Sequence, residues 1–248
     1  MTEMLFRTEP YARECTARVV SAGPEGVVLD RTVFYAQGGG QPGDAGLLRW
    51  EGAEMPPGEM PPGEMPVTNA VKGENGTVLH VPAAGAPLPA PGAEVTAVLD
   101  WERRHRLMRM HTTLHLLCSL IPGAGVTGGQ IGVEKSRLDF DLAEPPTKEW
   151  LSERLTALAA EDHAVGERWI TEAELDENPN LVRTLSVKPP RGAGQVRLVR
   201  IGAEAAPVDL QPCGGTHVAR TGEIGAVTVA KLENKGKQNR RVYVTLEG

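Results

Sequence analysis

The 21 residues from 101 to 121 (WERRHRLMRMHTTLHLLCSLI) constrain the fold most, because they contain no Gly or Pro in a chain with 29 Gly and 20 Pro. Apolar residues recur along this segment at three- and four-residue spacing, at Leu107, Met110, Leu114, Leu117 and Ile121. This spacing predicts an amphipathic helix over 101–121, ended by Pro122 and Gly123. The composition changes at its start, so we expect a domain boundary near residue 100, with domains 1–100 and 101–248.

The first hundred residues contain short segments rich in Val and Leu, separated by Gly and Pro. These segments are 16–22, 26–34, 45–50, 76–81 and 94–100. Short apolar runs with this punctuation are typical of strands in a small barrel or sandwich. We therefore expect residues 1–100 to form a small β-barrel-like domain.

A Glu-Met-Pro-Pro-Gly repeat occupies residues 53–67 (AEMPPGEMPPGEMPV). Proline at this density removes backbone donors and disfavours both helix and central strand. We expect a Pro-rich, exposed insertion in a turn, without a catalytic role.

A Gly-rich run occupies residues 35–46 (YAQGGGQPGDAG). It lacks the Lys-Ser/Thr end of a phosphate-binding P-loop, and no helical pattern follows it. Three consecutive glycines permit a close backbone approach to a ligand or to another segment, and they equally suit a hairpin turn.

The second half mixes helix and strand. Residues 147–166 carry a helical pattern with Thr147 as N-cap. Strands are expected at 195–201, 224–234 and 240–247. The predicted fold class is therefore α+β.

His111 and His115 lie four residues apart on the expected helix 101–121. This spacing puts both imidazoles on one helical face, within reach of one metal ion. Spacing alone leaves a pair of core histidines and a pair of metal ligands equally open.

A second pair, Cys213 and His217, lies in QPCGGTHVARTGEIG (211–225). Gly214 and Gly215 favour a tight turn, which can aim a thiolate and an imidazole at one point. Three imidazoles and one thiolate form a donor set that zinc prefers. Because the two pairs are far apart in the sequence, the fold would have to bring them together.

Two other chemistries are less compatible with these residues. A metalloprotease of the His-Glu type needs Glu directly after the first histidine, where this chain has Thr112. A nucleophilic Cys213 with His217 as base needs a third, orienting group, and the neighbouring sequence offers none.

The net charge of −6 argues against broad, non-specific binding of nucleic acid. Local basic clusters do occur at 103–109 and 231–241, although such clusters are usually solvated faces. Three cysteines do not suggest a disulfide framework. There is no apolar run of membrane-spanning length and no signal-peptide pattern, so we expect a cytoplasmic protein without a membrane partner.

Several ordered motifs together resemble the editing domain of alanyl-tRNA synthetases and its free-standing relatives, the AlaX proteins of medium length. The motifs are FYAQGGGQPGDAG, RMHTTLHLL, VTGGQIGVEKSRLDFD, VRLVRIG and QPCGGTHVARTGEIG. The resemblance runs from about residue 30 to 245, apart from the Pro-rich repeat. It implies a small N-terminal β-barrel-like domain followed by an α/β two-layer editing domain.

The resemblance implies a hydrolase that acts in trans on mischarged tRNA(Ala). It would remove serine, and also glycine, and spare Ala-tRNA(Ala), with tRNA as the partner and no role for DNA. An alanine site cannot exclude the smaller glycine, and serine adds only one hydroxyl, so discrimination in the pocket reaches only about 10–200-fold and a second hydrolytic site is needed.

The resemblance also implies roles for individual residues. One zinc ion per chain would be held by His111, His115, Cys213 and His217. The residue expected to position the ester or the water is Gln130, and the residue expected to sense the serine hydroxyl is Thr127. The pocket would be shaped by Gly38, Gly39, Gly40 and Gln41. Acceptor-stem phosphates would be gripped by Lys235, Lys237, Arg240 and Arg241.

Two alternatives remain. The chain could be a tRNA- or synthetase-binding module that does not hydrolyse, with a structural zinc site, although the intact ligand motifs and Gln130 argue against this. It could also be another hydrolase or scaffold with a structural zinc. A departure from the family is that Thr112 and Thr113 stand between the helix histidines, where relatives often have smaller residues.

Overall fold

The computed structural model describes residues 1–51, 63–185, 192 and 194–247. The chain divides into two compact units. The first comprises 1–38 and 42–105, and the second comprises 39–41 and 106–248. The division falls inside helix α2 (Trp101–Leu120), and it assigns three residues of the Gly-rich run to the second unit.

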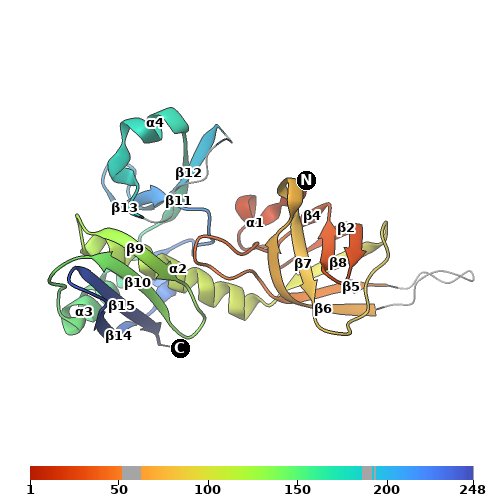
Figure 1. Ribbon diagram of the computed structural model, residues 1–248, viewed down its shortest axis with the longest axis horizontal. Coiled ribbons are helices and arrows are strands. Elements are labelled where there is room, and N and C mark those ends of the chain that lie inside the picture. The colour runs from red at the N-terminus through yellow and green to blue at the C-terminus, as the bar shows by residue number, and fades with distance from the viewer. Residues whose placement is uncertain (52–62, 186–191, 193, 248) are drawn as a thin grey trace, which may run out of the picture. The chain divides into compact units, whose positions relative to one another are not determined.

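The first unit contains a closed six-strand barrel in the order β2-β3-β7-β6-β5-β8 (Figure 1). These strands are β2 Glu14–Gly23, β3 Gly26–Leu29, β5 Gly46–Trp50, β6 Gly63–Lys72, β7 Val78–Pro82 and β8 Glu94–Leu99. The smaller elements are β1 Glu3–Met4, α1 Leu5–Thr8, β4 Arg31–Thr32 and the 3₁₀ turn η1 Glu74–Gly76. Closure pairs β2 with β8, so neither strand is left as an open edge.

Alternating side chains fill the barrel. On β8, Val95, Ala97 and Leu99 are buried, while the residues between them are partly exposed. This period of two is the pattern expected of a strand with one face on a core. The prediction of a β-barrel-like N-terminal part is confirmed.

The prediction that residues 53–67 form an exposed turn insertion is wrong for its last five residues. Residues 63–67 begin β6, which pairs with β5 from Gly63 opposite Trp50 to Val67 opposite Gly46. Residues 52–62, with most of the repeat, lie outside the described residues.

The physical reason lies in the alternation within this strand. Met65 and Val67 are buried in the barrel core, while Pro66 between them is exposed. Pro66 has no N–H to donate, but its carbonyl accepts a hydrogen bond from the Ala83 N–H at 2.9 Å. Burial of the two apolar side chains therefore outweighs the missing donor.

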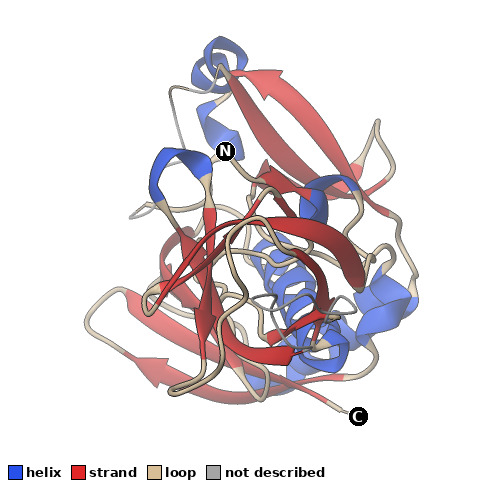
Figure 2. Cartoon of the chain, turned by 90° about the vertical axis from the view of Figure 1, so that its right-hand side faces the viewer, coloured by secondary structure: helices blue, strands red, loops and turns tan. Residues whose placement is uncertain are grey.

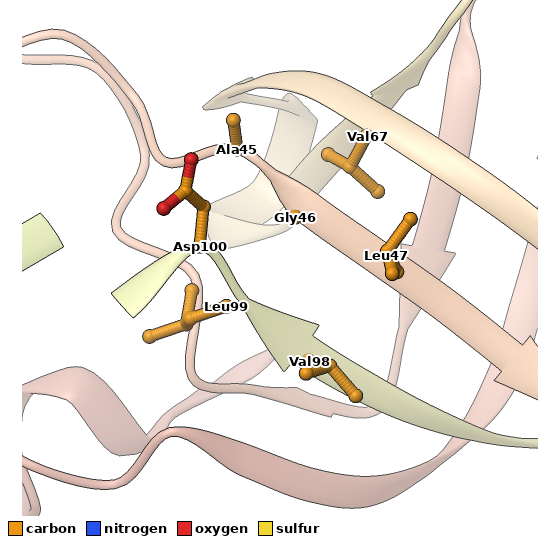
Figure 3. Close-up of a pocket in the computed structure, with 7 residues that line it drawn as sticks. All are labelled: Ala45, Gly46, Leu47, Val67, Val98, Leu99 and Asp100. Carbon is orange, nitrogen blue, oxygen red and sulfur yellow. The ribbon is translucent and has the colours of Figure 1, made fainter. Parts of the chain in front are cut away.

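A cavity of about 340 Å³ lies beside β5 and β8 (Figure 3). Its walls are mostly apolar, and Asp100 is the one charged residue among those that line it. The Asp100 carboxylate accepts a hydrogen bond from the Arg103 N–H at 3.1 Å, as a helix N-cap does. The acidic group is thus explained by the start of α2.

The second unit contains a four-stranded antiparallel sheet in the order β14-β15-β10-β9 and a three-stranded antiparallel sheet in the order β11-β12-β13. The larger sheet consists of β9 Gly125–Gln130, β10 Ser136–Asp141, β14 Val227–Asn234 and β15 Asn239–Leu246. The smaller sheet consists of β11 Val165–Thr171, β12 Gln195–Gly202 and β13 Pro207–Pro212. The other elements are α3 Lys148–Ala160, α4 Glu172–Glu177 and the 3₁₀ turns η2 Pro179–Leu181 and η3 Thr221–Ile224. This mixture of strands and helices, red and blue in Figure 2, confirms the α+β class.

Helix α2 matches its prediction to within one residue at its C-terminal end. Helix α3 starts as predicted, because the Thr147 side chain accepts a hydrogen bond from the Trp150 N–H at 3.2 Å. It ends at Ala160, so the predicted end at 166 is wrong. Asp162 adopts the left-handed conformation (φ 52°), which stops the helix before β11 begins.

Helix α3 packs against β14 through two hydroxyl groups as well as its apolar face. The Ser152 hydroxyl accepts from the Val229 N–H at 2.9 Å, and the Thr156 hydroxyl accepts from the Val227 N–H at 3.0 Å. Among the helices of the described ranges, none has both the length and the apolarity to cross a membrane.

Candidate metal centre

The middle of α2 and the turn after β13 bring four potential metal ligands together. His111 and His115 project from α2, and Cys213 and His217 come from the segment that follows Pro212. Their ligand atoms all lie within 4.8 Å of one another. The Cys213 Sγ atom is 3.4 Å from His111 Nε2 and 3.3 Å from His217 Nε2. The fold thus joins the two pairs, and the group could hold a metal ion.

Each of the three imidazoles contacts a protein partner through Nδ1. The contacts are His111 with Gln41 Oε1 at 2.8 Å, His115 with Asp209 Oδ2 at 2.8 Å, and His217 with Thr112 Oγ1 at 3.2 Å. In each ring Nε2 is then the nitrogen left for an ion. In metal-binding histidines of proteins, one ring nitrogen binds the ion and the other donates a hydrogen bond to a protein group or water.

The partners of Gln41 fix the tautomer of His111. The Gln41 Oε1 atom accepts a hydrogen bond from the Thr216 N–H at 3.1 Å, while Nε2 of the same amide donates to Thr216 Oγ1 at 2.8 Å. Since an amide oxygen only accepts, the His111 Nδ1 atom must donate to it. A lone pair therefore remains on His111 Nε2, as a metal ligand requires.

Thr112 fixes the tautomer of His217 in the same way. Its hydroxyl donates to the Met108 carbonyl at 2.9 Å and thereby uses its one hydrogen. It can then only accept from His217 Nδ1 and from the Val218 N–H, which lies 3.3 Å away. Thr112 therefore stands where a metalloprotease has its general base, and it orients the His217 ring instead.

Charges within the group set its protonation. Burial raises the pKa of the Cys213 thiol, but the charges and hydrogen bonds of the neighbouring histidines outweigh it and hold that pKa well below its ordinary value. Burial and the charge of His111 hold the pKa of His217 well below its ordinary value. A thiolate and a neutral imidazole are the forms that bind metal.

His115 behaves differently because it faces a carboxylate. Burial lowers its pKa, but the hydrogen bonds to Asp209 and Cys213 prevail and raise the pKa to about 10. The Asp209 side chain is buried and also accepts a hydrogen bond from Gln211 Nε2 at 2.8 Å. An ion that binds at His115 must therefore displace a proton from it.

The Gly-rich run supplies three residues to this unit. Gly39 and Gly40 adopt positive φ angles of 57° and 81°, which favour glycine. The Gly40 carbonyl accepts from the Ile131 N–H at 2.9 Å, directly after β9. Through Gln41, the same tripeptide reaches His111. The fourth residue expected to shape the pocket, Gly38, belongs to the first unit, where its carbonyl accepts from the Tyr35 hydroxyl at 2.8 Å.

The position of His111 leaves no room for a side chain at residue 215. A Cβ atom at this position would lie 2.2 Å from His111 Cε1 and 2.8 Å from Gln41 Oε1. The turn that carries Cys213 is also held by Arg197, which donates to the carbonyls of Cys213 at 2.8 Å and Gly215 at 3.0 Å.

The two residues expected to contact substrate lie on β9. Gln130 is exposed and ends the strand, next to the residue that binds Gly40. Thr127 is partly buried, and its hydroxyl donates to Asn239 Oδ1 at 3.3 Å. Gly40 bonds to Ile131 directly after β9, and its neighbour Gln41 bonds to His111. This end of β9 is therefore connected to the four potential metal ligands.

The expected tRNA-binding residues lie on β15 and in the turn between β14 and β15. Arg241 makes two hydrogen bonds of 2.7 Å to the Asp139 carboxylate, and Arg137 donates to the same carboxylate at 2.8 Å. Burial raises the pKa of Asp139, but these two arginines outweigh it and lower that pKa below its ordinary value. The trio keeps one net positive charge.

The other three basic residues are placed nearby. Lys235 is 3.3 Å from the Glu233 carboxylate, and Lys237 is exposed. Arg240 donates to the carbonyls of Ala143 at 2.6 Å and Gly236 at 2.8 Å, which order its side chain without cancelling its charge.

Several residues of this centre have no counterpart among the sequence predictions. Asp209, Gln211, Thr216 and Arg197 all act on the ligands or on their turn. Asp209 and Gln211 alternate along PVDLQP (207–212), and two polar residues of one strand that share a buried face would have been a usable signal.

Two family models match the chain. Residues 196–243 match the threonyl and alanyl tRNA synthetase second additional domain, and residues 6–103 match the class II (A) tRNA synthetases. A barrel followed by an α+β unit with a His₃Cys group, matched in this way, defines a relative of the synthetase editing region.

Individual relatives show to which family within this class the chain belongs. The alanyl-tRNA editing protein AlaX-M of Methanosarcina acetivorans is 37% identical over 254 residues, covering 99% of both chains. The AlaX-M protein of Saccharolobus solfataricus is 34% identical over the whole of both chains. The alanine–tRNA ligase of Pyrobaculum arsenaticum is 36% identical over 94% of this chain and 25% of its own length. The chain belongs to the AlaX family of alanyl-tRNA editing proteins.

Proposed function

We propose that this protein is a zinc-dependent deacylase that hydrolyses Ser-tRNA(Ala), and also Gly-tRNA(Ala), in trans and spares Ala-tRNA(Ala). The observation that carries the proposal is the convergence of three imidazoles and one thiolate within 4.8 Å. The names of the AlaX-M relatives, which cover the whole chain, support an action on alanyl-tRNA.

The donor set fits zinc in both chemistry and orientation. Gln41, Asp209 and Thr112 each take the Nδ1 of one histidine and so direct Nε2 toward the shared point. Zinc bound there would supply a positive charge that polarises an ester carbonyl or a water. One site of this kind per chain is consistent with the four ligands.

Two residues of β9, Gln130 and Thr127, would contact the substrate. Gln130 is exposed at the end of the strand and would orient the ester or the water. Thr127 would sense the serine hydroxyl through its own hydroxyl group. That hydroxyl group also donates a hydrogen bond to Asn239 Oδ1. Pairing with a hydroxyl separates serine from alanine, because the unpaired polar group left in the alanine complex costs about 1–3 kcal/mol.

The basic side chains beside this sheet support tRNA as the partner. Lys235, Lys237, Arg240 and Arg241 would contact acceptor-stem phosphates, whose binding depends on such charges. Since charged tRNA is a cytoplasmic molecule, we place the activity in the cytoplasm.

Deacylation of Ser-, Gly- and Ala-tRNA(Ala), with and without a zinc chelator, tests the proposal. We expect loss of serine and glycine from tRNA in the absence of chelator, with alanine retained. Cys213→Ala should abolish turnover while circular dichroism shows an intact fold, and Cys15→Ala, which changes a thiol of the first unit, should leave it unchanged. Equal hydrolysis of the three substrates would refute the specificity, and protection of the ester would indicate a binding module instead.

A further inference from the structure

The second unit contains a cleft of about 350 Å³ that none of the four metal-group residues lines. It lies between the end of α4, the turn η2 and β13. The charged residues on its walls are Glu177, Arg183 and Asp209. A space of this size suits a small organic ligand.

Two of the residues that line this cleft carry a buried polar atom without a hydrogen-bond partner. In the part of the chain that the structure describes, three buried side-chain atoms lack a hydrogen-bond partner: Arg183 Nε, Arg197 Nε and Asp209 Oδ1. Two of the three belong to residues that line the cleft. One of these atoms is a donor and the other is an acceptor. A buried polar group without a partner is unfavourable, so a ligand that pairs with both atoms would gain binding free energy.

The free atom of Asp209 is its Oδ1. Its Oδ2 already accepts hydrogen bonds from His115 Nδ1 and Gln211 Nε2, each at 2.8 Å. An occupant of the cleft would therefore meet Asp209 through Oδ1, and the bond to His115 can stay in place.

The charges on the walls select the class of ligand. Two carboxylates and one guanidinium sum to one negative charge, which disfavours a simple anion. A simple cation would satisfy Asp209 but would leave Arg183 Nε unpaired. A molecule with an ammonium group for Asp209 and a carboxylate for Arg183 satisfies both atoms, with charge-assisted hydrogen bonds.

We propose that this cleft is a second ligand site that binds a free α-amino acid between Asp209 and Arg183. The site is separate from the proposed deacylation and holds or fails independently of it. Because Asp209 also bonds to a metal-group histidine, a bound amino acid and a bound metal would change each other's affinity by the same factor.

Calorimetric titration of the zinc-loaded full-length protein with alanine tests the proposal. Alanine is chosen because the proposed catalytic pocket spares it, and its analogues ethylamine and propionate each lack one of the two charges. We expect saturable binding of alanine and at least tenfold weaker binding of both analogues. No saturable binding of alanine, or equal binding of either analogue, would overturn the proposal. An ordered water that bridges the two atoms would give this negative result.

Two further measurements locate the site. Arg183→Met should weaken alanine binding at least tenfold, whereas Arg154→Met, which removes an exposed arginine of α3, should not change it. If Arg183→Met does not fold, amide NMR of the unmutated protein decides. Alanine should then shift the signals of Leu181 and Leu210 in the cleft, and shifts confined to other residues would contradict the assignment.

Discussion

The hydroxyl of Thr112 lies 3.2 Å from Nδ1 of His217 and, having donated its hydrogen to Met108, can only accept from that ring. The residue that excludes metalloprotease chemistry therefore has a positive role as well. It holds one imidazole in the tautomer that presents Nε2 to a metal ion.

Removal of this hydroxyl should weaken metal binding. We expect Thr112→Val to lower zinc affinity by about 10–100-fold, the usual effect of losing a partner of a ligating histidine. Competition with a chromophoric chelator measures the affinity. Thr112→Ser should restore it, and Thr113→Val is the matched control because the Thr113 hydroxyl donates to the Arg109 carbonyl of its own helix. An equal loss in both valine variants would point to a general packing effect.

The two glycines of the Cys213 turn should respond differently to alanine. Gly215→Ala would force a methyl group against His111, a clash of the kind that costs about 1–3 kcal/mol, and should displace the ring. We expect at least a tenfold loss of zinc affinity and lower turnover of Ser-tRNA(Ala). Gly214→Ala adds a methyl group with no atom within 4 Å and should behave like the unmutated protein. Zinc content after dialysis compares the two, and the reverse order of sensitivity would contradict this geometry.

The buried pair Arg104–Asp44 should be essential to the first unit. Both side chains are almost fully buried, and Arg104 also donates to the Val33 carbonyl at 2.7 Å while Asp44 accepts from the Tyr35 N–H at 2.6 Å. Arg104→Met would leave a buried carboxylate without its cation, so we expect a loss of about 3–5 kcal/mol in the free energy of unfolding. Urea titration measures it. The double variant Arg104→Met/Asp44→Asn should lose less than Arg104→Met alone, and a strictly additive result would show that the two groups do not interact.

His80 should make the barrel sensitive to acid. Burial lowers its pKa to about 4, while its Nδ1 donates to the Val27 carbonyl at 2.9 Å and its Nε2 accepts from the Thr32 hydroxyl at 2.8 Å. In the unfolded chain His80 takes up a proton near pH 6.5, so the unfolded state binds more protons between pH 6.5 and 4. The contribution of His80 to the free energy of unfolding is therefore complete above pH 6.5. It declines by up to about 3 kcal/mol as the pH falls toward 4.

Urea titrations at a series of pH values measure this decline. His80→Gln provides the control, because glutamine has no titratable proton. Its free energy of unfolding should depend less steeply on pH in this window, and an unchanged slope would mean that another group titrates there.

Five of the six barrel strands, all except β6, and α2 could be predicted because each is a local pattern of apolar residues with Gly or Pro at its ends. Four potential ligands were visible for the same reason, as two pairs with fixed spacing. Among the strands of five residues or more, β6, β9, β10, β11 and β13 were not predicted. They contain glycines (GVTGGQ), charges (SRLDFD) or prolines (PVDLQP), so their identity depends on pairing partners rather than on their own pattern.

Local patterns do not show which ligand each partner contacts. Gln41 contacts His111 across 70 positions of sequence, and Asp209 contacts His115 across 94. Hydrogen bonds of this range leave no periodic trace. The end of α3 was missed because a single left-handed residue, Asp162, stops a pattern that otherwise continues.

The grouping of Gly39–Gln41 with the second unit has a practical consequence for dissecting the protein. A fragment that begins at residue 106 retains His111, His115, Cys213 and His217 but loses Gln41 and, with it, the acceptor for His111 Nδ1. A minimal fragment with the complete candidate metal centre cannot be cut out as one continuous stretch of chain. A shortened protein for grafting or miniaturisation would have to carry the tripeptide along, for example through a linker that joins it to the start of the 106–248 stretch.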